Sequence, residues 1–270
     1  MHSLLKTSLS ADFIFYRRNR LLAVIGVLFV FIWVMTLVPT LLFDSSSIKF
    51  DLVQRTLIQS GWFINIFVAA LGVLIMSHHL NHRCLKMVIT KPCPMETWVL
   101  SKWLSALLVS AMLYLLMLFA AVILFLVWHI PFQAGLLFVV VDSFFRSVLI
   151  LSVIIALTAL IHPFVAVLVM LVFGADSFYG LTIFLSAMLK SVTNPVYHFM
   201  LRCAKAVCYG LYWILPAYTP FKEETRHIYS SLRMTWCDLS YLGLTFVYAV
   251  VLGLFFYLLT VLVLKRRRLT

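Results

Sequence analysis

Three charged residues stand inside long apolar runs, where a charge is energetically costly. Asp142 and Arg146 are four positions apart in one run, so a helix would place them on the same face. Asp176 stands near the middle of another run, beside Gly174. Charged side chains at such depth usually face a bundle interior or an aqueous cavity. We expect Asp142, Arg146 and Asp176 to line a substrate pathway. The alternatives are a mutually neutralising Asp142–Arg146 pair, a pairing of Asp176 with Arg146, or a protonated Asp176.

Histidine side chains offer a second kind of chemistry. His78, His79 and His82 form an H-H-x-x-H cluster, in which His78 and His82 share a helical face and could bind a metal ion. Membrane di-iron enzymes use several such clusters, whereas the other histidines of this chain are scattered singly. We favour an interfacial polar cluster and predict no metal site. An intramembrane enzyme, metal-dependent or lipid-modifying, is the alternative function.

The composition indicates that lipid surrounds these residues. The chain has 64% hydrophobic and 11% charged residues and a mean hydropathy of +1.09, whereas soluble domains carry about 25% charge. Its net charge of +12 comes from basic residues that flank apolar runs rather than from a stripe on a polar surface. That placement is typical of membrane topology signals and argues against nucleic-acid binding.

We therefore expect an all-α polytopic membrane protein that forms one transmembrane domain over residues 1–270. Residues 1–20 mix basic and apolar side chains at helical spacing, which predicts an interfacial helix. Arg202 and Lys205 interrupt residues 196–215, which predicts an amphipathic or re-entrant helix in an outer segment over 190–240. Six spans of about 20 residues account for the remaining apolar sequence: 21–43, 57–76, 103–128, 135–161, 164–189 and 241–264.

The distribution of basic residues predicts the orientation. With the N-terminus inside, the cytoplasmic segments hold twelve Lys and Arg residues close to span ends, against eight in longer outer segments. Both termini are then cytoplasmic, and we expect an integral protein of the bacterial cytoplasmic (inner) membrane. This topology places Cys203, Cys208 and Cys237 outside, where two of them could form a disulfide. The sequence leaves that pairing open.

The segment between the second and third spans carries a family signature. Residues 78–108 read HHLNHRCLKMVITKPCPMETWVLSKWLSALL: a short apolar helix, a proline, a few polar residues, an apolar pair, and a lysine at the next span. This pattern resembles the cytoplasmic loop of type-2 ABC exporter permeases. The basic end of the N-terminal helix and the basic cluster after the last span fit the same family, as does the stretch from Trp213 to Phe221. The family's usual acidic residue and Gly-Thr pair are replaced here by histidines and Cys84.

The resemblance implies a function and a set of partners. In that family the loop carries a coupling helix that docks on an ATPase subunit, so residues 78–102 would be the coupling loop. The contacts would come from Leu85, Lys86, Ile89, Pro92, Glu96, Thr97 and Lys102. The chain contains no G-x-x-x-x-G-K-[ST] motif, so ATP and Mg²⁺ would bind the partner and no cofactor is expected on this chain.

Further partners would be a second permease copy or homologue, membrane lipids and, as an open possibility, an outer accessory protein. Export is the direction that the resemblance implies. A purely structural subunit is a third alternative, against which the intramembrane charges argue.

Overall fold

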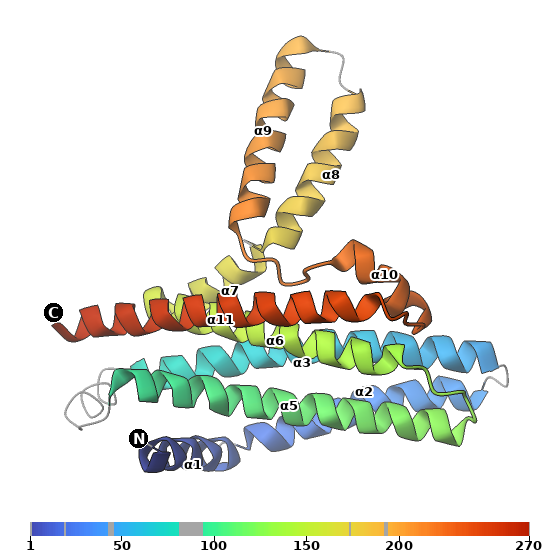
Figure 1. Cartoon of the computed structure of the whole chain (residues 1–270), viewed down its shortest axis with the longest axis horizontal. Coiled ribbons are helices and arrows are strands. Elements are labelled where there is room, and N and C mark those ends of the chain that lie inside the picture. Colours follow the sequence, from blue (N-terminus) through green and yellow to red (C-terminus); the bar gives the residue numbers. More distant parts are fainter. Residues whose placement is uncertain are drawn as a thin grey trace. The chain divides into compact units, whose positions relative to one another are not determined.

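The computed structural model describes residues 2–18, 20–42, 46–80, 94–172, 174–191 and 194–269, and every regular element within these ranges is a helix. The chain divides into two compact units. The first comprises Met1–Ile161 with Phe221–Thr270, and the second comprises His162–Pro220. Figure 1 shows the helices of both units.

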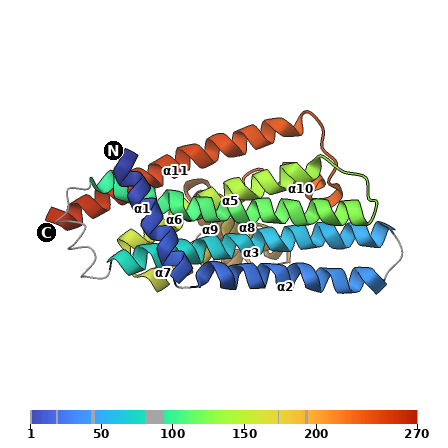
Figure 2. The same cartoon turned by 90° about the horizontal axis from the view of Figure 1, so that it is seen from below.

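The first unit is a helical bundle built around α6, the most buried of its long helices. The helix α6 packs against α3, α5 and α11, and α2 packs against α3 (Figure 2). The helix α5 contains neither Gly nor Pro over its 33 residues, which explains its unbroken length. The described helices of this unit are α1 (His2–Arg18), α2 (Leu21–Leu42), α3 (Ser46–Leu80), α5 (Met95–Val127), α6 (Gly135–Leu160), α10 (Lys222–Ser231) and α11 (Asp238–Leu269).

Long apolar helices identify the chain as an integral membrane protein. Among the described residues, four helices are long and apolar enough to cross a bilayer. They are Lys49–Ser77, Met95–Val127, Gly135–Leu160 and Asp238–Arg266, which correspond to four of the six predicted spans. A fifth crossing results if the bent pair Leu5–Arg18 and Ala23–Met35, which meet at 64°, is one span. The all-α prediction is confirmed, whereas the count of six spans is not.

The predicted span over residues 164–189 is divided into two shorter helices of the second unit. The helix α7 (Pro163–Val172) has 10 residues and α8 (Ala175–Ser191) has 17, against about 20 for a straight crossing. Gly174 lies between them, where a Cβ would come within 2.7 Å of the Tyr218 ring. The backbone N–H of Ala175 donates to the carbonyl oxygen of Pro216 at 3.2 Å. A distant segment therefore packs against the break, and only glycine leaves room for it.

A helix, α9 (Pro195–Ile214), covers the segment at 196–215 for which the sequence predicts an amphipathic or re-entrant helix. Its place relative to the membrane stays a prediction. Asn194 caps it by accepting a hydrogen bond from the backbone N–H of Val196 at 3.0 Å, and Pro195 occupies the first helical turn. The helix packs along α8, so the two form a helical hairpin. The thiols of Cys203, Cys208 and Cys237 are all free in the structure.

The contact between Gly135 and Leu232 gives a first testable prediction. A Cβ on Gly135 would lie 2.1 Å from the carbonyl oxygen of Leu232, which also accepts the Gly135 N–H at 3.1 Å. Because the obstacle is backbone, Gly135→Ala must displace the end of α10, and we expect a loss of about 1–3 kcal/mol in unfolding free energy. Thermal unfolding in detergent measures it. Gly243→Ala is the matched control, because open space surrounds Gly243 in α11; equal stability of the two variants would contradict the prediction.

Candidate functional site

A buried charge cluster joins α6 to α10. Asp142 is 1% exposed, and its Oδ2 lies 2.7 Å from Arg146 Nη2 one helical turn later. The Tyr229 hydroxyl donates to the same Oδ2 at 2.6 Å, and the Arg146 guanidinium stacks 5.0 Å from the Tyr229 ring centroid. The second oxygen, Asp142 Oδ1, is buried and has no hydrogen-bond partner among the described residues. The charges of Asp142 and Arg146 thus neutralise each other, and Asp142 Oδ1 remains as an unused hydrogen-bond acceptor among the described residues.

The short helix α10 positions Tyr229 over this pair. Residues in the left-handed conformation, Phe221 and Leu232, bound the helix at its two ends and turn the chain sharply there. Gln54 of α3 donates from Nε2 to the backbone carbonyl oxygen of Tyr229. Burial raises the pKa of the Tyr229 phenol still further above physiological pH, so the phenol stays protonated as the hydrogen-bond donor to Asp142. Three helices, α3, α6 and α10, therefore meet at one charged cluster.

A neutral polar cluster lies deeper between α3, α5 and α6. The Tyr114 hydroxyl is 3.0 Å from Ser147 Oγ and 3.1 Å from Asn65 Oδ1, and Ser147 donates to the same Asn65 oxygen at 2.5 Å. In the described part of the chain, the buried hydroxyls of Ser60 and Ser110 have no hydrogen-bond partner. A polar seam therefore continues from the charge cluster into the middle of the bundle.

A second buried ion pair fastens α1 to the beginning of α5. Lys102 Nζ donates to Asp12 Oδ1, and the two side chains are only 3% and 4% exposed. Beside this pair, Tyr16 OH lies 3.1 Å from Ser105 Oγ, and Ser8 Oγ lies 2.7 Å from Ser101 Oγ. The N-terminal helix is thus held against α5 by a line of polar contacts.

The helix α11 holds the first turn of α5 from another direction. Lys265 Nζ lies 2.5 Å from Glu96 Oε1, and the Tyr257 hydroxyl donates to the Glu96 carbonyl oxygen at 3.0 Å. We call these contacts the α5 clamp: the ion pairs Asp12–Lys102 and Glu96–Lys265, together with Tyr257. The clamp lies at the bundle end where Figure 2 shows both chain termini.

The predicted coupling residues divide into two groups. Leu85, Lys86, Ile89 and Pro92 lie outside the described residues, as does His82. Glu96 is partly exposed, whereas Thr97 and Lys102 are buried. The Lys102 side chain points into the protein, where it pairs with Asp12. The prediction that these residues contact an ATPase stays a prediction.

The predicted pathway residues are also only partly placed. The structure brings Asp142 and Arg146 together in the core as an ion pair, and their place in a substrate pathway stays a prediction. Asp176 belongs to α8, but its side chain is outside the described part, as are those of His78 and His79 in α3. Sequence reasoning missed Tyr229, Gln54, Asp12 and Lys265 as partners, because each contacts a residue far away along the chain.

The helices and these buried clusters define a polytopic membrane protein whose bundle is fastened at both ends by charged contacts. No family model matches the chain, and comparisons with curated proteins and with solved structures also give no match.

The hydroxyl of Tyr229 gives a second testable prediction. Tyr229→Phe removes a charge-assisted hydrogen bond to Asp142, so we expect a loss of about 1.5–3 kcal/mol in unfolding free energy. Thermal unfolding of the purified chain measures this loss. Tyr197→Phe is the control, because Tyr197 is 62% exposed on α9. A Tyr229→Phe variant as stable as that control would show that the bond contributes nothing.

Proposed function

We propose that this chain is the membrane-spanning permease subunit of an ATP-driven ABC exporter, with ATP hydrolysis on a separate chain. A second permease copy or homologue would complete the assembly. The family resemblance of residues 78–108 motivates this proposal. The α5 clamp is the structural observation that supports it most.

The clamp would convert a local push into a movement of several helices. Glu96 and Lys102 stand in the first turns of α5, directly after the proposed coupling loop. Their partners Lys265 and Asp12 belong to α11 and α1. Because the Asp12–Lys102 pair is buried and cannot open without leaving an uncompensated charge, a displaced α5 would carry α1 with it. The Glu96–Lys265 pair is about half exposed, so α11 would follow through the Tyr257 hydrogen bond and its packing on α5. An ATPase that binds the loop would therefore act on three helices at once.

The distribution of charge supports a cytoplasmic location for the clamped end. Arg17 and Arg18 close α1, and Lys265 and Arg266 lie near the end of α11; all four side chains are exposed. Basic residues gather on the cytoplasmic side of membrane proteins. In this orientation, the loop that we propose for ATPase docking and both termini lie on the side where ATP is present. The bacterial cytoplasmic membrane is the location that we propose.

The charge cluster at the other end supports a role in the transport cycle. Asp142, Arg146 and Tyr229 join α6 to α10 near the outer end in this orientation. We assign the cluster to the outer part of the pathway, where it would hold α10 over the bundle until substrate passes. Asp142 Oδ1 is the acceptor that remains for a substrate or water.

Affinity purification of the tagged chain in mild detergent tests the proposed function. We expect an ATP-binding subunit to co-purify with the wild type and to be depleted from Lys86→Glu/Lys91→Glu. The control variant Lys190→Glu/Lys222→Glu makes the same charge change outside the loop and should retain the subunit. A wild-type chain that recovers no ATPase under several mild conditions would contradict the proposal.

A further inference from the structure

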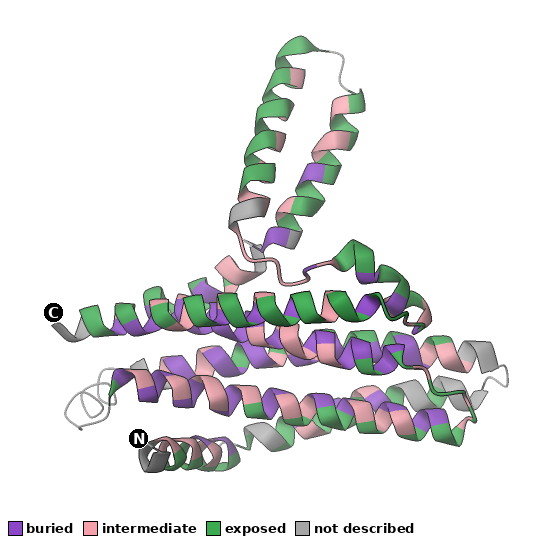
Figure 3. Cartoon of the chain, viewed as in Figure 1, coloured by how far each residue is buried: buried purple, intermediate pink, exposed green. Residues whose placement is uncertain are grey.

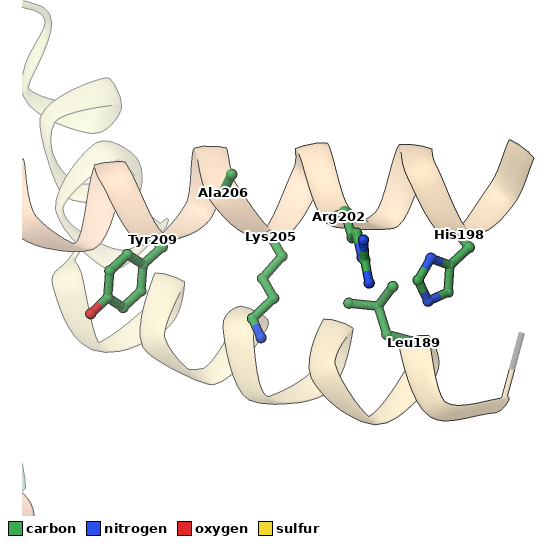
Figure 4. Close-up of a pocket in the computed structure, with 6 residues that line it drawn as sticks. All are labelled: Leu189, His198, Arg202, Lys205, Ala206 and Tyr209. Atoms are coloured by element: carbon green, nitrogen blue, oxygen red, sulfur yellow. The ribbon is translucent and has the colours of Figure 1, made fainter. Parts of the chain in front are cut away.

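A groove of about 580 Å³ lies between α8 and α9 in the second unit. Its lining residues are Leu189 from α8 and His198, Arg202, Lys205, Ala206 and Tyr209 from α9. Figure 4 shows the side chains of His198, Arg202, Lys205 and Tyr209 all extending from α9 toward α8. The described lining residues therefore include two basic side chains and one imidazole, and none of these described residues is acidic.

The cations of this groove lack a counter-charge within the described protein. Neither Arg202 nor Lys205 forms an ion pair with any described residue. Two cations that face one space repel each other, so an anion placed between them would be bound favourably. An arginine fork beside a lysine and an imidazole suits the several oxygens of a phosphate group.

The opposite face of α9 is apolar and exposed, which favours the phosphate of a lipid over free phosphate. The groove residues recur at positions 198, 202, 205 and 209, and the residues two positions earlier, at 196, 200, 203 and 207, lie on the other side of the helix. Of these, Val196, Met200 and Val207 are 62–65% exposed, and the neighbouring Phe199 is 68% exposed. On α8, Ile183 and Phe184 are also more than half exposed. The hairpin thus combines a cationic groove with an apolar exterior, and exposed residues dominate both helices (Figure 3).

We propose that the groove between α8 and α9 binds the phosphate of an anionic lipid headgroup, with the acyl chains against the apolar exterior of the hairpin. Arg202 and Lys205 contact the phosphate oxygens, His198 adds a hydrogen bond, and Leu189 and Tyr209 form the walls. A zwitterionic choline headgroup fits poorly, because its ammonium group finds no anion among the lining residues that the structure describes. Lipid binding in this groove does not require that the chain transports a substrate.

Native mass spectrometry of the delipidated full chain tests this proposal by titration with phosphatidylglycerol or phosphatidylcholine. We expect the wild type to prefer phosphatidylglycerol, and Arg202→Gln/Lys205→Gln to bind it roughly tenfold or more weakly. The matched control Lys222→Gln/Arg226→Gln removes the same charge from exposed residues outside the groove and should bind as the wild type does. If the double variant loses helicity, the single variants Arg202→Gln and Lys205→Gln are titrated instead, each with an expected severalfold loss.

Two results would overturn the proposal. The first is an equal loss of phosphatidylglycerol binding in the groove variant and in the control, because binding would then reflect net charge alone. The second is complete displacement of the lipid by millimolar inorganic phosphate, which would assign the groove to free phosphate. Retention of phosphatidylglycerol in the presence of inorganic phosphate is the expected result, because only the lipid also contacts the apolar exterior.

Discussion

Replacement of Lys102 by methionine is expected to destabilise the bundle by about 3–5 kcal/mol, because the substitution leaves the Asp12 carboxylate buried without its cation. Methionine fills a similar volume, so the loss reports the charge rather than a cavity. The Asp12 side chain is only 4% exposed, and water therefore replaces the lysine poorly. Thermal unfolding in detergent measures the stability. A cysteine crosslink between positions 8 and 101, whose hydroxyls lie 2.7 Å apart, reports whether α1 stays on α5.

The double variant Asp12→Asn/Lys102→Met distinguishes the cost of an unpaired buried charge from the cost of changing the side chain at position 102. It removes both charges, so we expect it to recover most of the stability that the single variant loses. Lys6→Met is the surface control, because Lys6 is exposed on the same helix α1. A Lys102→Met variant as stable as Lys6→Met, with an unchanged crosslink, would show that the ion pair does not hold α1.

Replacement of Arg146 by methionine is the second substitution with a large expected effect. It removes the cation from the 1% exposed Asp142 and from the Tyr229 ring, so we expect a loss of about 3–5 kcal/mol in unfolding free energy. Because α10 is held by Tyr229, limited proteolysis should also cut residues 222–231 faster in this variant. The two readouts together distinguish local release of α10 from global loss of stability.

Two further variants test whether the lost stability of Arg146→Met comes from the unpaired charge of Asp142. Asp142→Asn/Arg146→Met removes the stranded charge and should be more stable than Arg146→Met alone. Arg226→Met is the control, because Arg226 is 80% exposed and lies 3.7 Å from Glu223. Unchanged proteolysis of α10 in Arg146→Met would contradict the role of the cluster in holding that helix.

The long helices could be predicted from the sequence because apolar runs without internal breakers leave few alternatives. The predicted spans at 103–128 and 135–161 fall on α5 and α6, although α5 begins eight residues before the predicted span, at Met95. The break near Gly174 was missed because it depends on Tyr218 and Pro216, which approach from beyond α9. Local hydropathy contains no information about such an approach.

The candidate site was predictable only where its partners are neighbours along one helix. Asp142 and Arg146 pair as i and i+4, a spacing visible in the sequence. Tyr229 is 87 positions from Asp142 and Lys102 is 90 positions from Asp12, so neither contact has a local pattern. Asp12 was visible only as a polar residue in an amphipathic segment. Its burial depends on the packing of α1 against α5.

Site-specific photo-crosslinking in native membranes tests the proposed permease function most directly. A photoreactive residue at position 91 would report what binds the proposed coupling loop. The same residue at position 132, between α5 and α6, is the control, because Phe132 is 56% exposed at the opposite end of α5. We predict a crosslink to an ATP-binding subunit from position 91 and none from position 132. Equal crosslinking from both positions, or from neither, would contradict the proposal that this chain couples to an ATPase through that loop.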